Sequence, residues 1–92
     1  CEELARLDTL YPGKPILHSL RDEIPGAARA IRSYAEALDK VYGEVAPTCS
    51  NALARIVRDP IGVLAGVVAW NFPLLQACWQ LGPARAAGNS VN

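Results

Sequence analysis

The sequence predicts an α/β domain built around a parallel sheet. A continuous apolar run rich in β-branched residues, residues 61–69, is typical of a parallel strand that is covered on both faces. A turn, a helical pattern and the start of another strand follow this run. Because a strand, a helix and a second strand in this order open a βαβ unit, we expect at least one such unit here.

Residues 1–10 predict the final turns of an amphipathic helix, since Leu4, Leu7 and Leu10 recur at helical spacing among charged residues. Residues 11–15 then hold two prolines and a glycine. Proline lacks the N–H group and clashes with the preceding turn, so the helix is predicted to end near Leu10.

The clearest predicted helix covers residues 24–41. Pro25 suits its first turn, and Asp22 or Glu23 favours the positive end of the helix dipole. Its apolar face follows i, i+3, i+4, i+7 spacing and consists of Ile24, Ala27, Ala28, Ile31, Tyr34, Ala35, Leu38, Val41 and Tyr42.

The end of this helix is marked by two features. Glu36 and Lys40 are predicted to form an i,i+4 pair, and Gly43 is predicted to supply the C-terminal stop. Beyond it, residues 46–51 predict a loop and residues 53–57 predict a strand.

The C-terminal third carries the predicted βαβ unit. Residues 61–69 are predicted to form its first strand, with a buried helix as the alternative. Residues 72–87 predict a helix with Pro73 in its first turn, ended by Gly88 and Asn89. One face of this helix carries Leu74, Cys78, Leu81 and Ala84 or Arg85.

Composition and charge exclude several classes of protein. With 51% hydrophobic and 20% charged residues, the 92-residue chain has the composition of a globular protein. Nine basic and nine acidic residues cancel and are scattered, so no nucleic-acid surface is expected. The longest apolar run is about half of the ~20 residues that a membrane-spanning helix needs, so no membrane span is expected.

The three cysteines, Cys1, Cys49 and Cys78, lie far apart and show no CxxC spacing or nearby histidine. No metal site is therefore predicted. Free thiols in a reducing cytoplasm are favoured, with disulfide pairing as the alternative. The chain begins without methionine and stops where a strand starts, so we expect it to be a piece of a longer domain, truncated at both ends.

Several motifs follow one another in a fixed order. Residues 70–74 (W-N-F-P-L), Trp79 and residues 82–89 (G-P-A-R-A-A-G-N) resemble the aldehyde dehydrogenase signature P-W-N-F-P…W-K-x-x-P-A-L-A-x-G-N. Residues 10–15 (L-Y-P-G-K-P) resemble that family's L-D-x-G-K-P, and residues 58–63 (R-D-P-I-G-V) resemble its R-E-P-V-G-V. The chain resembles this family over essentially its whole length.

The resemblance implies a fold and a reaction. Residues 1–92 would be part of an N-terminal cofactor-binding domain with a Rossmann-like parallel sheet that binds NAD or NADP. In the family, a cysteine thiolate attacks an aldehyde, hydride passes to the nicotinamide, and the thioester is hydrolysed to the acid. That cysteine lies outside this chain, so the fragment alone is expected to be inactive.

The resemblance also assigns residues. Asn71 matches the family's oxyanion asparagine, whose side-chain N–H groups donate to the developing negative oxygen. The positions that line the nicotinamide and its ribose, largely through backbone groups, are matched by Val67, Val68, Ala69, Trp70 and Asn71.

Residues 21–32 and 39–46 look most like the branch of the family that oxidises γ-glutamyl-γ-aminobutyraldehyde. The resemblance therefore implies a small-molecule aldehyde as the substrate. The parent protein is expected to be a cytoplasmic homodimer or homotetramer.

Several of these residues have structural alternatives. Asn71 is also a good helix N-cap. Trp79 is predicted to be a core aromatic, and His18 a surface residue. Cys49 and Cys78 lack a neighbouring base and are not expected to be catalytic.

Two other interpretations of the whole chain remain. It could be a non-catalytic helical interaction fragment, in which residues 24–41 bind a partner, or a decayed gene product. Arg85 and Asn92 motivate the second, because a charge on a buried helix face and an amide inside a parallel strand both cost free energy.

Overall fold

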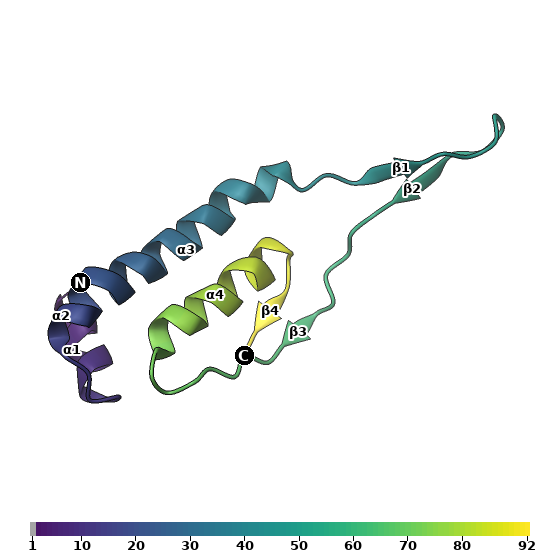
Figure 1. The fold of residues 1–92 in the computed structure, drawn as a ribbon. Coiled ribbons are helices and arrows are strands. Elements are labelled where there is room, and N and C mark those ends of the chain that lie inside the picture. The colour runs from purple at the N-terminus through teal and green to yellow at the C-terminus, as the bar shows by residue number, and fades with distance from the viewer. Residues whose placement is uncertain (1) are drawn as a thin grey trace.

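The structure is a computed structural model that describes residues 2–92 (Figure 1). Cys1, where the predicted N-terminal helix starts, lies outside the described residues. The chain is elongated, with principal extents of 63 × 23 × 15 Å and a radius of gyration of 18.4 Å. A compact chain of this length would have a radius of gyration of about 12 Å, so most side chains here remain exposed.

The N-terminal region is helical. Helix α1 (Glu2–Leu10) confirms the predicted amphipathic helix. The chain turns at Gly13, which has a φ of 75°, and becomes helical again in α2 (Ile16–His18) and the π-helical turn η1 (Ser19–Glu23). These lead into α3 (Ile24–Ala37), which confirms the principal helix. The sequence pattern missed the helical segment before it because a π-turn breaks the usual spacing of apolar residues.

The end of α3 differs from the prediction in two details. The helix tightens into the 3₁₀ turn η2 (Leu38–Lys40), and the backbone is already extended at Val41, before Gly43. Gly43 is therefore not the helix stop. The Lys40 ammonium donates to the Glu36 backbone carbonyl and pairs with the Asp39 carboxylate at 2.9 Å, so the predicted pair with the Glu36 carboxylate is wrong.

Helix α4 (Pro73–Ala86) lies along α3 (Figure 1). At the contact, a Cβ atom on Gly82 would lie only 2.5 Å from Cδ2 of Tyr34. A Cβ on Gly26 would lie 3.3 Å from a methyl group of Leu75. The apolar face of α3 that the interaction-fragment alternative assigns to an external partner thus packs against α4 within the chain.

A β-hairpin follows η2 and precedes β3 and α4. Strand β1 (Glu44–Ala46) pairs antiparallel with β2 (Ala54–Ile56), with Val45 opposite Arg55. β2 confirms the predicted strand, whereas β1 was missed. β1 is only three residues long and has no buried side chain, so it carries no alternating pattern. The hairpin projects away from the helices (Figure 1).

The predicted βαβ unit is present. Strand β3 (Val63–Leu64) and strand β4 (Ser90–Val91) pair in parallel and are joined by α4, so the alternative of a buried helix is wrong. The predicted coverage of the first strand on both faces is also wrong for this chain. Val63 is 74% exposed and Val67 is 87% exposed, because β4 is the only strand paired with β3 within residues 2–92.

The end of α4 follows the prediction closely. Gly88 has a φ of 81°, and its N–H donates to Arg85 O at 3.0 Å, while the Asn89 N–H donates to Ala84 O at 3.0 Å. This is the Schellman arrangement. The buried Asn89 side chain also accepts from the Gly62 N–H at 2.9 Å, which ties the helix end to the chain entering β3.

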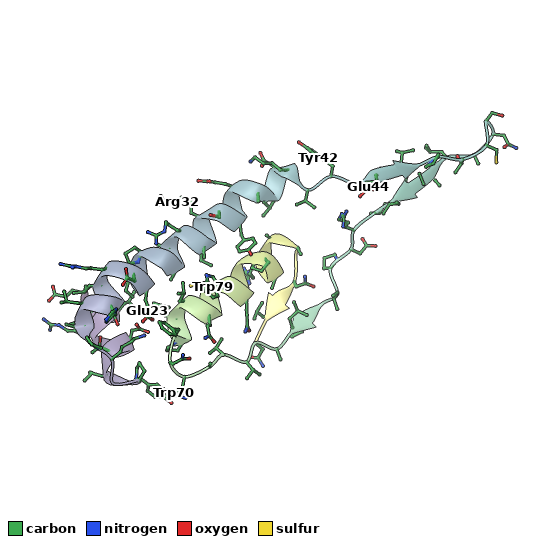
Figure 2. All side chains as sticks on the ribbon, viewed as in Figure 1. Glu23, Arg32, Tyr42, Glu44, Trp70 and Trp79 are labelled. Atoms are coloured by element: carbon green, nitrogen blue, oxygen red, sulfur yellow. The ribbon has the colours of Figure 1, made fainter. Side chains whose placement is uncertain are left out.

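Three residue predictions need correction. Trp79 is 56% exposed on α4 and is not a core residue here (Figure 2). Arg85 and Asn92 are exposed, so neither places a polar group in a buried position within residues 2–92. Within residues 2–92, no layer covers the exposed sides of Trp79 and Asn92, whereas Arg85 lies at the edge of the contact between α3 and α4. No described helix is long and apolar enough to cross a membrane.

Candidate active site at the turn before α4

The candidate site is the segment that connects β3 to α4. Beyond β3, the Gly66 N–H still donates to Asn92 O at 3.1 Å, so the parallel pairing continues to this point. The chain then leaves the pair and reaches α4 through exposed residues, among them Ala69, Trp70 and Asn71 (Figure 2). A parallel strand that delivers its end directly to a helix start is where α/β proteins bind nucleotides.

Two glutamines of α4 hold this segment. Gln80 Nε2 donates to the Val67 carbonyl at 2.9 Å, and the Ala69 N–H donates to Gln76 Oε1 at 2.8 Å. Two of the backbone groups in the predicted cofactor segment are thereby engaged by the protein itself. Within residues 2–92, the backbone groups of Val68 and Trp70 make no such bond.

Asn71 lies at the exposed tip of this turn. The N-cap of α4 is Phe72, and no side chain of the described residues caps the helix there. The capping role considered for Asn71 is therefore not observed. The Asn71 side-chain amide makes no hydrogen bond to residues 2–92, whereas its backbone carbonyl accepts one from Lys14 Nζ at 3.3 Å.

Lys14 belongs to a buried ion cluster beneath the turn, made of Lys14, Asp8 and Glu23. Its ammonium pairs with Asp8 Oδ2 at 2.9 Å and with Glu23 Oε1. Ser19 donates to Asp8 Oδ2 at 2.9 Å, which joins α1 to η1. The same ammonium lies 5.2 Å from the centroid of the Phe72 ring. Lys14 therefore connects the N-terminal helices to the two residues that precede α4.

The two carboxyl groups of the ion cluster have pKa values shifted in opposite directions. Burial raises the pKa of Asp8, but the contacts with Lys14 and Ser19 outweigh burial and leave that pKa below its usual value. Burial raises the pKa of Glu23, the contact with Lys14 offsets this only in part, and the negative charge of Asp8 raises the pKa further. Burial lowers the pKa of Lys14, yet the two carboxylates leave it raised. Lys14 stays protonated, with Asp8 as its stronger anionic partner.

Cys49 and Cys78 are free thiols, as favoured, and His18 is a surface residue, as predicted. Burial raises the pKa of the Cys78 thiol, which disfavours the reactive thiolate. Cys49 is exposed in the hairpin loop, and His18 lies on the surface, 3.7 Å from Asp22. Among the described residues, no group of histidine, cysteine and acidic side chains could hold a metal ion.

The five predicted site residues, residues 67–71, are consecutive and lie on the segment between β3 and α4; their roles stay a prediction. Sequence reasoning missed the side chains that hold this segment, Gln76 and Gln80 on α4 and Lys14 below. The L-Y-P-G-K-P motif contains Lys14 and could have drawn attention to it. Its hydrogen-bond partner, Asn71, lies 57 positions away, and the sequence does not show that the two residues meet.

Comparison with known proteins identifies the class. The model of the aldehyde dehydrogenase family matches residues 1–92, and this chain belongs to that family. It is 74% identical over 90 residues to the NADP/NAD-dependent aldehyde dehydrogenase PuuC of Escherichia coli, covering 98% of this chain and 18% of that protein.

Solved structures agree. P. syringae AldA indole-3-acetaldehyde dehydrogenase, in complex with NAD+ and IAA, superposes with a TM-score of 0.95 at 57% identity, over 98% of this chain and 18% of that one. The γ-glutamyl-γ-aminobutyraldehyde dehydrogenase of Burkholderia cenocepacia gives 0.94 at 52% identity, with the same coverage. The chain therefore spans about a fifth of the length of these relatives.

Proposed function

We propose that the full-length protein containing this chain oxidises an aldehyde to a carboxylic acid with NAD or NADP. The observation that carries the proposal is the match to the aldehyde dehydrogenase family along the entire chain, with the W-N-F-P segment at the junction of a parallel strand and a helix. In this proposal the βαβ unit is the beginning of a Rossmann-like parallel sheet, and residues 1–92 are part of the cofactor-binding domain.

Asn71 is the catalytic residue of this proposal. A cysteine elsewhere in the full-length protein would attack the aldehyde carbon, and negative charge would develop on the carbonyl oxygen. The Asn71 amide is exposed and makes no hydrogen bond within residues 2–92, so it is available to donate to that oxygen. Removal of one such donor from other enzymes lowers the rate by about 10²- to 10³-fold.

The segment before Asn71 suits a nicotinamide nucleotide. Bound NAD or NADP would accept the hydride from the substrate. Val68 and Trp70 have backbone groups available for hydrogen bonding, and Val67 and Ala69 are held in place by α4. A site that binds the nucleotide through backbone groups of this segment does not need a glycine-rich phosphate-binding loop.

For the substrate we propose a small aldehyde of the γ-glutamyl-γ-aminobutyraldehyde type. The support is the sequence likeness of residues 21–32 and 39–46 to that branch, together with the Burkholderia cenocepacia relative of that name. We further propose a cytoplasmic homodimer or homotetramer. The free thiols of Cys49 and Cys78 fit a reducing compartment.

The proposal is tested with the purified full-length protein, by following formation of NADH or NADPH with γ-glutamyl-γ-aminobutyraldehyde and with shorter and longer aldehydes. Turnover with at least one aldehyde, and its loss in Asn71→Ala, is expected. An enzyme that reduces neither NAD nor NADP with any of these aldehydes would contradict the proposal.

A further inference from the structure

We propose that Lys14 is a positioning residue for Asn71: it holds the backbone of the turn that presents the Asn71 amide to the reacting oxygen. This inference rests on the proposed function, because it assigns to Lys14 a share of the oxyanion role of Asn71.

The first step of the argument is the contact itself. Lys14 Nζ donates to the Asn71 backbone carbonyl at 3.3 Å and lies 5.2 Å from the Phe72 ring centroid. One ammonium group thus contacts both residues that immediately precede α4. A cation over an aromatic face attracts the ring, so the contact restrains Phe72 as well as Asn71.

The second step is that, between Ala69, which is bonded to Gln76, and the start of α4, little besides Lys14 fixes the turn. Phe72 has φ −137° and ψ 56°, outside the helical region, and no side chain of the described residues caps α4 at this end. The next backbone restraint is the Gln76 N–H, which donates to Phe72 O at 3.0 Å. Within residues 2–92, Lys14 is the one side chain that donates to the Asn71 carbonyl.

The third step is that Lys14 is itself immobilised. Its side chain is 13% exposed, and those of Asp8 and Glu23 are 3% and 2% exposed. A lysine on the surface samples many rotamers, but here a departure of the ammonium would leave two buried carboxyl groups without a cation. The Lys14 ammonium is therefore held in place by the two carboxyl groups, and through its hydrogen bond it restrains the Asn71 backbone.

The consequence concerns catalysis. Catalytic donors act only when they are held close to the productive geometry, and a misplacement of about 1 Å can cost about 10²-fold in rate. Loss of Lys14 is expected to free the Asn71 backbone and lower the hydride-transfer rate by about 10- to 100-fold, with a much smaller change in the aldehyde KM.

The test is a double-mutant cycle in the full-length enzyme. Lys14→Met is made in the parent and in Asn71→Ala, and the rate of hydride transfer is measured in a single turnover. The exposed Lys40→Met is the matched control and should keep the parental rate. If Lys14 acts through Asn71, Lys14→Met should lower the rate 10- to 100-fold in the parent and less than about threefold in Asn71→Ala.

A second set of variants keeps the test valid if Lys14→Met does not fold. Asp8→Asn, Glu23→Gln and Lys14→Met together remove every charge of the ion cluster, and this triple variant is compared with and without Asn71→Ala. Lys14→Arg retains the positive charge and should recover part of the rate. Equal losses in both Asn71 backgrounds, or an unchanged rate in the parent background, overturn the inference.

The outcomes separate this inference from the proposed function. If Asn71→Ala is slow but Lys14→Met acts independently of it, the proposed function stands and the positioning role is wrong. If the full-length protein reduces no nicotinamide nucleotide, both are wrong. If it oxidises an aldehyde but Asn71→Ala reacts at the parental rate, aldehyde oxidation stands, and the roles of Asn71 and Lys14 are wrong.

Discussion

The N-terminal helices and the β1–β2 hairpin each contain ion pairs. Those between Lys14, Asp8 and Glu23 are buried, and the one in the hairpin is exposed. Lys14 lies between Asp8 and Glu23, whose side chains are almost completely buried. Arg58 pairs with Glu44 at 3.0 Å while their side chains are 61% and 62% exposed. Buried charges need partners, whereas exposed charges are solvated and screened, so only the helical end should depend on its ion pairs.

The apolar residues show the same contrast. Helices α3 and α4 satisfy their backbone hydrogen bonds internally and pack against each other within the chain. Within the described part of the chain, the segment around β3 pairs with β4 alone, and Ile61 and Val67 are 86% and 87% exposed. A strand depends on neighbours from elsewhere in the sequence. We therefore expect the remaining part of a full-length aldehyde dehydrogenase to pack on this segment.

The largest effect on stability is expected for Lys14→Met. Removing the cation that pairs with two buried carboxyl groups should lower the free energy of unfolding by roughly 3–5 kcal/mol. Denaturant titration of the full-length protein measures this, and the neutral triple variant with Asp8→Asn and Glu23→Gln should recover most of the loss. A cost below about 1 kcal/mol would place the ion cluster in the same class as a surface pair.

A steric change at the helix contact should come next. Gly82→Ala places a methyl group against the Tyr34 ring, so either the ring must turn away or the two helices must move apart. We expect a loss of about 1–3 kcal/mol, measured as a shift of the denaturation midpoint. Tyr34→Leu in the Gly82→Ala background should restore part of it. If Gly82→Ala is neutral, the close approach of α3 and α4 is not needed for stability.

The stability of Glu23 and Asp8 variants is expected to depend on pH in opposite ways. The pKa of Glu23 is raised above its ordinary value of 4.5, so Glu23 favours folding below that pH and this contribution is lost as the pH rises through the raised value. Glu23→Gln imitates the protonated form. Its melting temperature relative to the parent should therefore improve as the pH is raised from acidic to neutral. Asp8 has a lowered pKa, so Asp8→Asn should show the opposite trend.

The smallest effect is expected for Arg58→Met in the hairpin. Its ion pair with Glu44 is solvated, so the change in the free energy of unfolding should stay below about 1 kcal/mol and shrink further in high salt. The same titration used for Lys14→Met gives the comparison directly. A loss as large as that of Lys14→Met would remove the distinction between the two regions.

Much of the fold followed from local patterns. The periodicity of α3, the prolines after α1 and the glycine after α4 act within one or two turns, and each predicted the observed element. The exposure of Trp79 and the coverage of β3 depend on which elements lie opposite. The sequence pattern predicts that a surface is apolar, but it does not say which part of a chain covers it.

The candidate site was predictable only as an assignment. Residues 67–71 were assigned through the family signature, and their roles stay a prediction; the structure adds that they lie between β3 and α4. Their supports were not predictable, because Lys14 reaches Asn71 across 57 positions and the two glutamines act from the following helix. Contacts of this kind arise only once the helices are packed.

The central claim is that Asn71 is an oxyanion donor, and it is tested most directly by single-turnover hydride transfer in full-length Asn71→Ala and Asn71→Asp, with melting temperatures measured alongside. Both variants lose the amide donor, so both should be slower by about 10²- to 10³-fold. Because the Asn71 side chain does not cap α4, both should melt close to the parent. If Asn71→Asp reacts at the parental rate while Asn71→Ala only melts earlier, Asn71 is a structural cap and the claim is wrong.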